Sequence, residues 1–211
     1  AAERMVELMA QVRDETGYVI EELDLGGGFG ICYTEKDAAL RYDSYMEKVS
    51  VVVKEACERL HFPQPFMMLE PGRSIVGPYG VTLYTVGAIK EIPGVRIYAA
   101  VDGGMTDNPR YALYQSEYEA LAANKAADPK TMTVTLAGKC CESGDLLGEG
   151  MPVQQLESGD IVAVLSTGAY NYSMASNYNR LCRPAVVLVR EGASRLIVRR
   201  ETMEDLIRCD L

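Results

Sequence analysis

A run of glycines and an acid–arginine pair are the first residues whose types and spacing could do chemistry. The run is Gly26-Gly27-Gly28-Phe29-Gly30 and the pair lies in Glu70-Pro71-Gly72-Arg73. Because glycine lacks Cβ, successive backbone N–H groups of such a run can turn toward an anion such as phosphate. An ordinary tight turn explains the run equally well, since it matches neither the dinucleotide fingerprint nor the Walker motif. For the acid and the arginine, the alternative is a solvated ion pair, although charges kept in a strand-end cleft usually bind something.

Three further segments carry side chains that could bind or catalyse. Arg110 and Tyr114 are one helical turn apart and could bind an anion if this stretch is helical, or they could be ordinary surface residues. The loop Cys140-Cys141-Glu142-Ser143-Gly144-Asp145 combines thiols, carboxylates and a hydroxyl, and a polar turn with incidental cysteines is the alternative. The segment 166–179, which includes Tyr170, is rich in small residues and tyrosines and could instead form an interface. Each segment alone is weak evidence of function.

The composition argues against several classes of partner and site. The chain has 21 basic and 30 acidic residues, a net charge of −9, and no run of Lys or Arg, so nucleic acid and anionic membranes are poor partners. Its apolar runs are too short to cross a bilayer and no signal-peptide pattern opens the sequence, so we expect a cytoplasmic protein with reduced thiols. Without a CxxC pair and with His61 as the only histidine, we expect no metal site.

Helix and strand patterns place the glycine run and the acid–arginine pair at the ends of two strands. Residues 1–16 predict a helix that ends at Gly17, with Met5, Leu8, Met9 and Val12 on its apolar face. No capping residue precedes this helix, so we expect the chain to begin inside it. Strands are predicted at 19–25 and 66–69, separated by a helix at 38–60. This order is typical of consecutive units in a parallel sheet, where functional loops follow the strands.

From residue 81 onward the sequence predicts short strands separated by turns. Turn signals include Pro93-Gly94, Asp102-Gly103-Gly104 and Ser158-Gly159-Asp160. The predicted strands span 81–92, 97–101, 132–136, 161–165, 185–190 and 195–199. We therefore predict an α/β domain at residues 1–78 and a mostly antiparallel β domain, a barrel or sandwich, at 79–211.

Taken together and in order, five motifs resemble the C-terminal part of the diaminopimelate decarboxylases, pyridoxal-phosphate enzymes of the alanine-racemase-like fold class. The motifs are Leu23-Asp24-Leu25-Gly26-Gly27-Gly28-Phe29-Gly30, Glu70-Pro71-Gly72-Arg73, Asp107-Asn108-Pro109-Arg110, Cys141-Glu142-Ser143-Gly144-Asp145 and Gly168-Ala169-Tyr170. The resemblance spans essentially the whole chain. It implies that residues 1–78 are the C-terminal part of a TIM-like (β/α) barrel.

The resemblance implies that the complete enzyme converts meso-diaminopimelate to L-lysine and CO₂ with pyridoxal 5'-phosphate as cofactor. It implies that the cofactor is bound by Gly26, Gly27, Gly28, Glu70, Pro71, Gly72, Arg73 and Tyr170. It implies that the substrate is bound by Arg73, Arg110, Tyr114, Glu142 and Tyr170. Cys141 is implied as the acid that protonates the α-carbon, and its loop as part of the neighbouring subunit's site in a homodimer.

The resemblance also implies parts that this sequence lacks. The family attaches the cofactor to a lysine on the first barrel strand, and no lysine here follows such a strand; the lysines are Lys36, Lys48, Lys54, Lys90, Lys125, Lys130 and Lys139. His61 is more typical of a helix C-terminus than of the family's ring-stacking histidine. We therefore expect the isolated 211-residue chain to be inactive. Two alternatives stay open, a decarboxylase of the ornithine or arginine type and a non-catalytic dimerisation or binding module.

Overall fold

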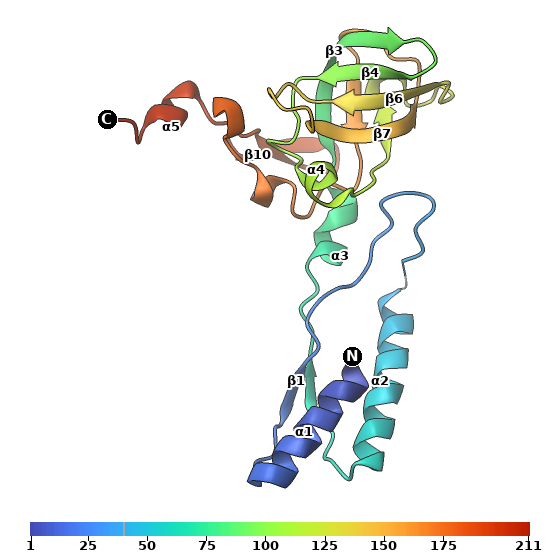
Figure 1. Ribbon diagram of the computed structural model, residues 1–211, viewed down its shortest axis with the longest axis vertical. Helices are drawn as coiled ribbons and strands as arrows, with labels where there is room; N and C mark the ends of the chain where they lie inside the picture. Colours follow the sequence, from blue (N-terminus) through green and yellow to red (C-terminus); the bar gives the residue numbers. More distant parts are fainter. Residues whose placement is uncertain (40) are drawn as a thin grey trace. The chain divides into compact units, whose positions relative to one another are not determined.

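The chain divides into two compact units in the computed structural model, which describes residues 1–39 and 41–211 (Figure 1). Unit 1 comprises Ala1–Cys32 and Lys36–Val76, and unit 2 comprises Tyr33–Glu35 and Gly77–Leu211. Each unit has a hydrophobic core of its own.

Unit 1 contains two parallel strands, two longer helices that share a hydrophobic core with them, and a short helix. Its elements are α1 (Ala2–Thr16), β1 (Glu22–Asp24), α2 (Tyr42–Arg59), β2 (Phe66–Met68) and α3 (Arg73–Val76). β1 and β2 pair in parallel, with Leu23 opposite Met67, which confirms the predicted parallel order. α1 ends where Gly17 adopts a left-handed conformation with φ of 75°, as expected of a glycine that closes a helix.

The predicted bounds in unit 1 are too wide. The strand predicted at 19–25 is wrong outside Glu22–Asp24, because the ladder with β2 extends over only three residues of each strand. The helix predicted from residue 38 begins at Tyr42, and Leu40 lies outside the described residues. The predicted apolar face of α1 is also displaced, since Val6, Met9 and Ala10 are the residues of this helix that are buried.

Unit 2 is built around a six-stranded sheet that curves into a nearly closed barrel (Figure 1). Its strands are β3 (Thr82–Ile92), β4 (Arg96–Val101), β5 (Ala120–Ala122), β6 (Met132–Ala137), β7 (Leu146–Val153) and β8 (Ile161–Val164). They pair in the order β5-β8-β3-β4-β6-β7, and the outermost strands β5 and β7 also contact each other. Every pairing is antiparallel except β4 with β6, which confirms the mostly antiparallel prediction. Buried side chains from these strands form the core of the barrel.

Two strands of this sheet were not predicted, for identifiable reasons. β7 contains Gly148, Gly150 and Pro152, residues that ordinarily mark turns, and its pairing with β6 is interrupted by two register shifts. β5 is three residues long and has the sequence Ala-Leu-Ala, which lacks the β-branched residues typical of strands.

Short elements outside the sheet complete unit 2. α4 (Arg110–Tyr114) and the short helices at Tyr172–Met174 and Tyr178–Arg180 lie in its long loops. The hairpin of β9 (Val186–Arg190) and β10 (Ala193–Val198) and the helix α5 (Met203–Ile207) follow. No helix in the described part of the chain combines the length and apolarity needed to cross a membrane.

The buried carboxylate of Asp160 generates a prediction about stability. It accepts hydrogen bonds from Lys125 Nζ (2.8 Å) and Asn124 Nδ2 (2.8 Å), and its pKa falls to about 2, mainly because of the Lys125 contact. Since this pKa lies below the unfolded value of about 3.9, the stabilisation is complete above about pH 4 and is lost as the pH falls toward 2. Asp160→Asn should therefore lower Tm by a few degrees at pH 6 and by much less at pH 2.5.

Thermal unfolding followed by circular dichroism at both pH values measures this difference. Glu157→Gln is the matched control, because Glu157 is exposed and lies 3.8 Å from the same Lys125 ammonium, so its removal should change Tm little. An equal loss of stability in Asp160→Asn at the two pH values would contradict the assignment.

Candidate functional site

In unit 1 the glycine run and the Glu70 turn lie side by side, beyond the ends of the two parallel strands. The backbone N–H of Glu70 donates to the carbonyl oxygen of Gly26 (2.9 Å), and the N–H of Gly26 donates to Asp24 Oδ1 (2.7 Å). A Cβ atom on Gly27 would stand 2.4 Å from the carbonyl oxygen of Glu70, so only glycine allows this approach. The structure thus brings together two groups that were predicted from separate parts of the sequence.

The glycine loop is open on one side and anchored at its far end. Gly26 and Gly28 have φ of 70° and 84°, in the left-handed region that favours glycine. Apart from the adjacent residues, no described part of the chain comes within 4 Å of the place of a Cβ at either glycine. The ring of Phe29 packs between those of Tyr42 and Tyr45, with centroid distances of 4.9 and 4.8 Å. The exposed Glu70 and the half-buried Arg73 flank the second loop.

In unit 2 the guanidinium of Arg110 lies between two tyrosine rings. It stands 5.4 Å from the ring centroid of Tyr114 and 5.3 Å from that of Tyr170. Its Nη2 makes a long hydrogen bond to Ser116 Oγ (3.4 Å), and its buried Nε has no acceptor among the residues that the structure describes. Among the described residues no carboxylate forms an ion pair with it. A half-buried, fixed cation with unused donors is suited to bind an anion.

Two buried asparagines lie close in sequence to the arginine and to Tyr170, Asn108 two residues before Arg110 and Asn171 directly after Tyr170. Asn108 is fully buried, and its side-chain amide contacts that of Asn171. Asn171 also donates to the carbonyl oxygens of Ala169 (2.9 Å) and Thr167 (3.2 Å). Tyr170 has φ of 69°, a conformation that a non-glycine residue holds only when its surroundings impose it.

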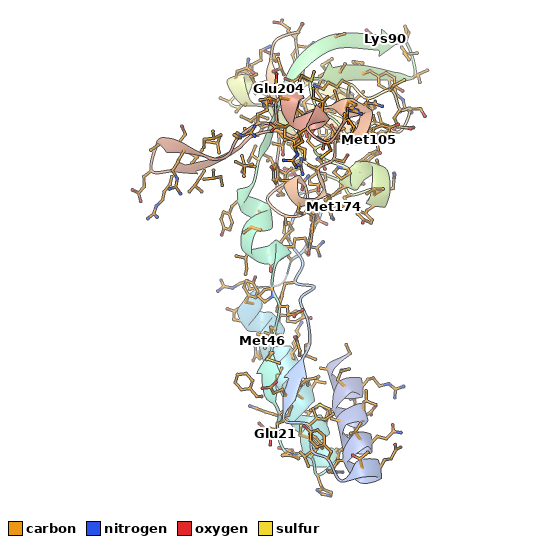
Figure 2. The ribbon with its side chains drawn as sticks, turned by 90° about the vertical axis from the view of Figure 1, so that its left-hand side faces the viewer. Glu21, Met46, Lys90, Met105, Met174 and Glu204 are labelled. Atoms are coloured by element: carbon orange, nitrogen blue, oxygen red, sulfur yellow. The ribbon has the colours of Figure 1, made fainter. Side chains whose placement is uncertain are left out.

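A backbone hydrogen bond joins the same two loops a few residues away. The N–H of Ser176 donates to the carbonyl oxygen of Thr106 (2.8 Å). Figure 2 labels Met105, which directly precedes Thr106, and Met174, which lies two residues before Ser176. Sequence reasoning missed the buried Asn108 and Asn171, although an asparagine before a proline was a usable turn signal.

The Cys141 loop forms a third group. The N–H of Cys141 donates to Asn179 Oδ1 (2.7 Å), and the side chain of Cys141 is exposed. Glu142 Oε1 accepts from the N–H of Gly144 (3.2 Å) and from Ser143 Oγ (3.4 Å), so this carboxylate folds back on its own loop. Within the described residues, no hydrogen bond or ion pair joins Cys141 or Glu142 to Arg110.

The neighbouring thiol, Cys140, has the opposite surroundings. Burial, and then the charge of Asp145 and its hydrogen bond with the thiol, raise the pKa of Cys140 to about 11. A thiol is nucleophilic only as its thiolate, so Cys140 is held in the unreactive form near neutral pH. Of the two adjacent cysteines, the exposed Cys141 is the better placed to exchange a proton with a ligand.

This difference predicts a pH profile of alkylation. The rate of iodoacetamide labelling at Cys140 should keep rising about tenfold per pH unit up to pH 10, because its thiolate fraction has not levelled off there. Pulse labelling from pH 7 to 10, with fragment-ion mass spectrometry to separate Cys140 from Cys141, measures the profile. In urea-unfolded protein the rate at Cys140 should level off above the ordinary thiol pKa of about 8.5. A plateau below pH 9.5 in the folded protein would contradict the raised pKa.

Comparison with known proteins gives a consistent result. Residues 18–168 match the family model described as the C-terminal sheet domain of pyridoxal-dependent decarboxylases. The chain is 53% identical over 211 residues to a diaminopimelate decarboxylase of Bacillus subtilis (strain 168), covering all of this chain and 48% of that protein. It is 51% identical over 194 residues to a diaminopimelate decarboxylase of Synechocystis, covering 92% of this chain and 41% of that protein.

Solved structures agree with the sequence comparison. A diaminopimelate decarboxylase of M. jannaschii in complex with L-lysine superposes with a TM-score of 0.89 at 32% identity, covering 100% of this chain and 47% of that one. The chain therefore spans about half the length of the relatives it matches. With more than half of its residues matched by the family model and five motifs in family order, the chain belongs to the pyridoxal-dependent decarboxylases.

Proposed function

We propose that the complete protein containing this chain decarboxylates meso-diaminopimelate to L-lysine and CO₂. The observation that carries the proposal is the half-buried Arg110, held between Tyr114 and Tyr170 with unused donors and no carboxylate partner among the described residues. An amino acid with a second carboxylate at its far end supplies the anion that this guanidinium lacks. The names of the relatives at 53% and 51% identity support the same substrate.

The residues of unit 1 fit the pyridoxal phosphate that the family requires. The open, left-handed loop at Gly26 and Gly28 has space for a phosphate, to which the N–H groups of Gly27 and Gly28 can donate, whereas the Gly26 N–H is bonded to Asp24 Oδ1. Gly27 holds this loop directly against the Glu70 turn, so a phosphate site and an exposed carboxylate share one end of the strand pair. We assign the phosphate to Gly26, Gly27 and Gly28 with the turn of Pro71, Gly72 and Arg73, and the ring nitrogen to Glu70. Tyr170 is proposed to contact both the phosphate and the substrate.

When bound, pyridoxal phosphate supplies an electron sink for the electron pair left as the carboxylate leaves the α-carbon. The chain's own residues do the rest. Arg110 and Tyr114, with Arg73, bind the distal carboxylate and fix the orientation of the substrate. Glu142 binds the distal ammonium through Oε2, while Oε1 accepts from the Gly144 N–H. Cys141 Sγ–H donates the proton that replaces CO₂ on the α-carbon.

Several assignments follow for the protein as a whole. We propose that unit 1 contributes the last strands of a TIM-like barrel, with the domain boundary between residues 78 and 79, and that the isolated chain is inactive because it lacks the cofactor's lysine. We also propose a homodimer in which the Cys141 loop completes the partner's site. Six free thiols suit the reducing cytoplasm, and the net charge of −9 disfavours nucleic acid and anionic membranes as partners.

An ornithine- or arginine-type decarboxylase is the weaker candidate. Those substrates have no distal carboxylate, so they would leave the half-buried Arg110 guanidinium without an anion. A non-catalytic binding module has no need for an unpaired arginine or for an open phosphate loop.

The direct test is release of CO₂ by the purified complete protein with pyridoxal phosphate. We expect turnover of meso-diaminopimelate and at least about 10³-fold lower kcat/KM for ornithine and arginine, because the distal carboxylate contact is absent. Chromatographic identification of L-lysine confirms the product. Equal or faster turnover of ornithine would overturn the substrate assignment, and no turnover of any amino acid would favour the binding module.

Arg110→Lys tests the carboxylate contact itself. Lysine keeps the charge but cannot form the paired N–H contacts or the planar stack between the tyrosine rings, so KM for meso-diaminopimelate should rise about 10- to 100-fold. Arg96→Lys is the matched control, because Arg96 also stacks on a tyrosine, Tyr98, but already pairs with Glu149. Steady-state kinetics should show KM within about twofold of wild type for the control. An unchanged KM in Arg110→Lys would remove Arg110 from the substrate site.

A further inference from the structure

We propose that Asp145 is a positioning residue that fixes the Cys141 loop to the segment leading into Arg110, through one buried carboxylate shared by backbone N–H groups of both. The catalytic consequence of this inference rests on the proposed decarboxylase activity. The structural claim, that the two segments open and close together, is independent of that activity.

The geometry of the carboxylate is the first support. Asp145 is 3% exposed, its Oδ1 accepts from the N–H of Met105 (2.6 Å) and its Oδ2 accepts from the N–H of Cys140 (2.7 Å). Cys140 immediately precedes Cys141, the proposed acid. Met105 is the second residue of the turn in which the carbonyl oxygen of Gly104 accepts from the N–H groups of Asp107 and Asn108, shortly before α4 and Arg110.

The Asp145 carboxylate packs against two glycines that could not carry a side chain beside it. A Cβ atom on Gly104 would stand 2.4 Å from Asp145 Oδ1, and one on Gly138 would stand 2.2 Å from Oδ2. The two segments are also joined directly by the Lys139 N–H, which donates to the carbonyl oxygen of Gly103 (3.0 Å), while the Gly138 N–H closes the Cys141 loop by donating to the carbonyl oxygen of Asp145 (2.8 Å). The Asp145 carboxylate therefore occupies the space between the Cys141 loop and the segment that leads into Arg110.

The chemistry of the contact requires a carboxylate. Among the described residues no lysine or arginine pairs with Asp145, so its charge is balanced by N–H dipoles rather than by a cation. Each carboxylate oxygen faces an N–H donor, and such charge-assisted hydrogen bonds are about twice as strong as neutral ones. An asparagine would turn one N–H₂ group toward an N–H donor and leave that donor unsatisfied in a buried place.

The consequence for catalysis follows from what the two segments carry. One carries the proton donor Cys141 and the other carries the arginine that binds the distal carboxylate. In the proposed homodimer the segment with Cys141 contributes to the partner's site, and the segment with Arg110 contributes to the site of its own subunit. Loosening Asp145 should therefore reduce both proton delivery and substrate affinity.

The experiment compares hydrogen exchange in Asp145→Asn, Asp160→Asn and wild-type complete protein, resolved to single amides by mass spectrometry. In Asp145→Asn the amides of Met105 and Cys140 should both exchange at least about tenfold faster. Asp160→Asn, which loses a buried carboxylate outside the proposed site, should leave both rates unchanged after correction for global stability. Acceleration of only one amide, or equal acceleration in the control, would overturn the proposal.

A measurement on the unmodified protein covers the case in which Asp145→Asn does not fold. If one shared contact closes both segments, the Met105 and Cys140 amides should show the same protection, and the same dependence on low concentrations of urea. Different protection or different urea dependence of the two amides would overturn the shared contact.

Kinetics separate the positioning role from a structural one. Asp145→Asn should lower kcat for meso-diaminopimelate about 10- to 100-fold and raise KM, because both segments shift. Asn179→Gly removes only the acceptor of the Cys141 N–H, at a φ of 53° that glycine tolerates, and should lower kcat with KM unchanged.

If wild type releases no CO₂, the proposed function fails while the exchange data still decide the structural coupling. If wild type is active and Asp145→Asn matches it, the positioning role fails alone.

Discussion

Buried backbone N–H groups in the loops of unit 2 must each find an acceptor, and the rest of the functional geometry depends on how they do so. An N–H group that is buried without an acceptor costs about as much free energy as a lost hydrogen bond. A buried loop therefore needs an acceptor for each N–H, either within the loop or on a neighbouring segment. Asp145 accepts from two such groups, Asn179 accepts from the N–H of the exposed Cys141, and Asn171 donates to carbonyl groups of its own loop. These hydrogen bonds fix the loops, and the positions of the loops determine where the side chains proposed to bind or catalyse lie.

Much of the fold could be predicted because it depends on local patterns. The periodicity of residues 1–16 and the glycine after them predict α1, and alternation between turn signals predicts most strands of unit 2. β7 was missed because Gly148, Gly150 and Pro152 are turn residues, and only the pairing with β6 makes this segment a strand. The buried face of α1 was displaced because Leu8 is 51% exposed while Val6 is buried, a choice made by the neighbours of the helix.

The candidate site was predictable to a different depth. Residue type and spacing made the glycine loop, Arg110 and the Cys141 loop candidates, since unusual chemistry at strand and helix ends is visible in the sequence, and only the five motifs in family order gave each of them a proposed role. The side chains that hold these segments in place were not identified, because the sequence alone does not distinguish a buried polar residue from an exposed one. Asp145 is the clearest case: it ends a recognisable motif, yet its value lies in contacts with Met105, forty residues away in the chain.

The strand order of the barrel also determines when unit 2 can form. β3 lies between β4 and β8, and Thr82 pairs with Val164, so the sheet needs partners from both ends of a long stretch of sequence. Closing so long a loop costs entropy before any contact offsets it, which makes sheets of this kind slow to fold. During synthesis one edge of β3 therefore waits, unpaired, until β8 has left the ribosome. This interval is when the chain is most exposed to association with other unfinished chains.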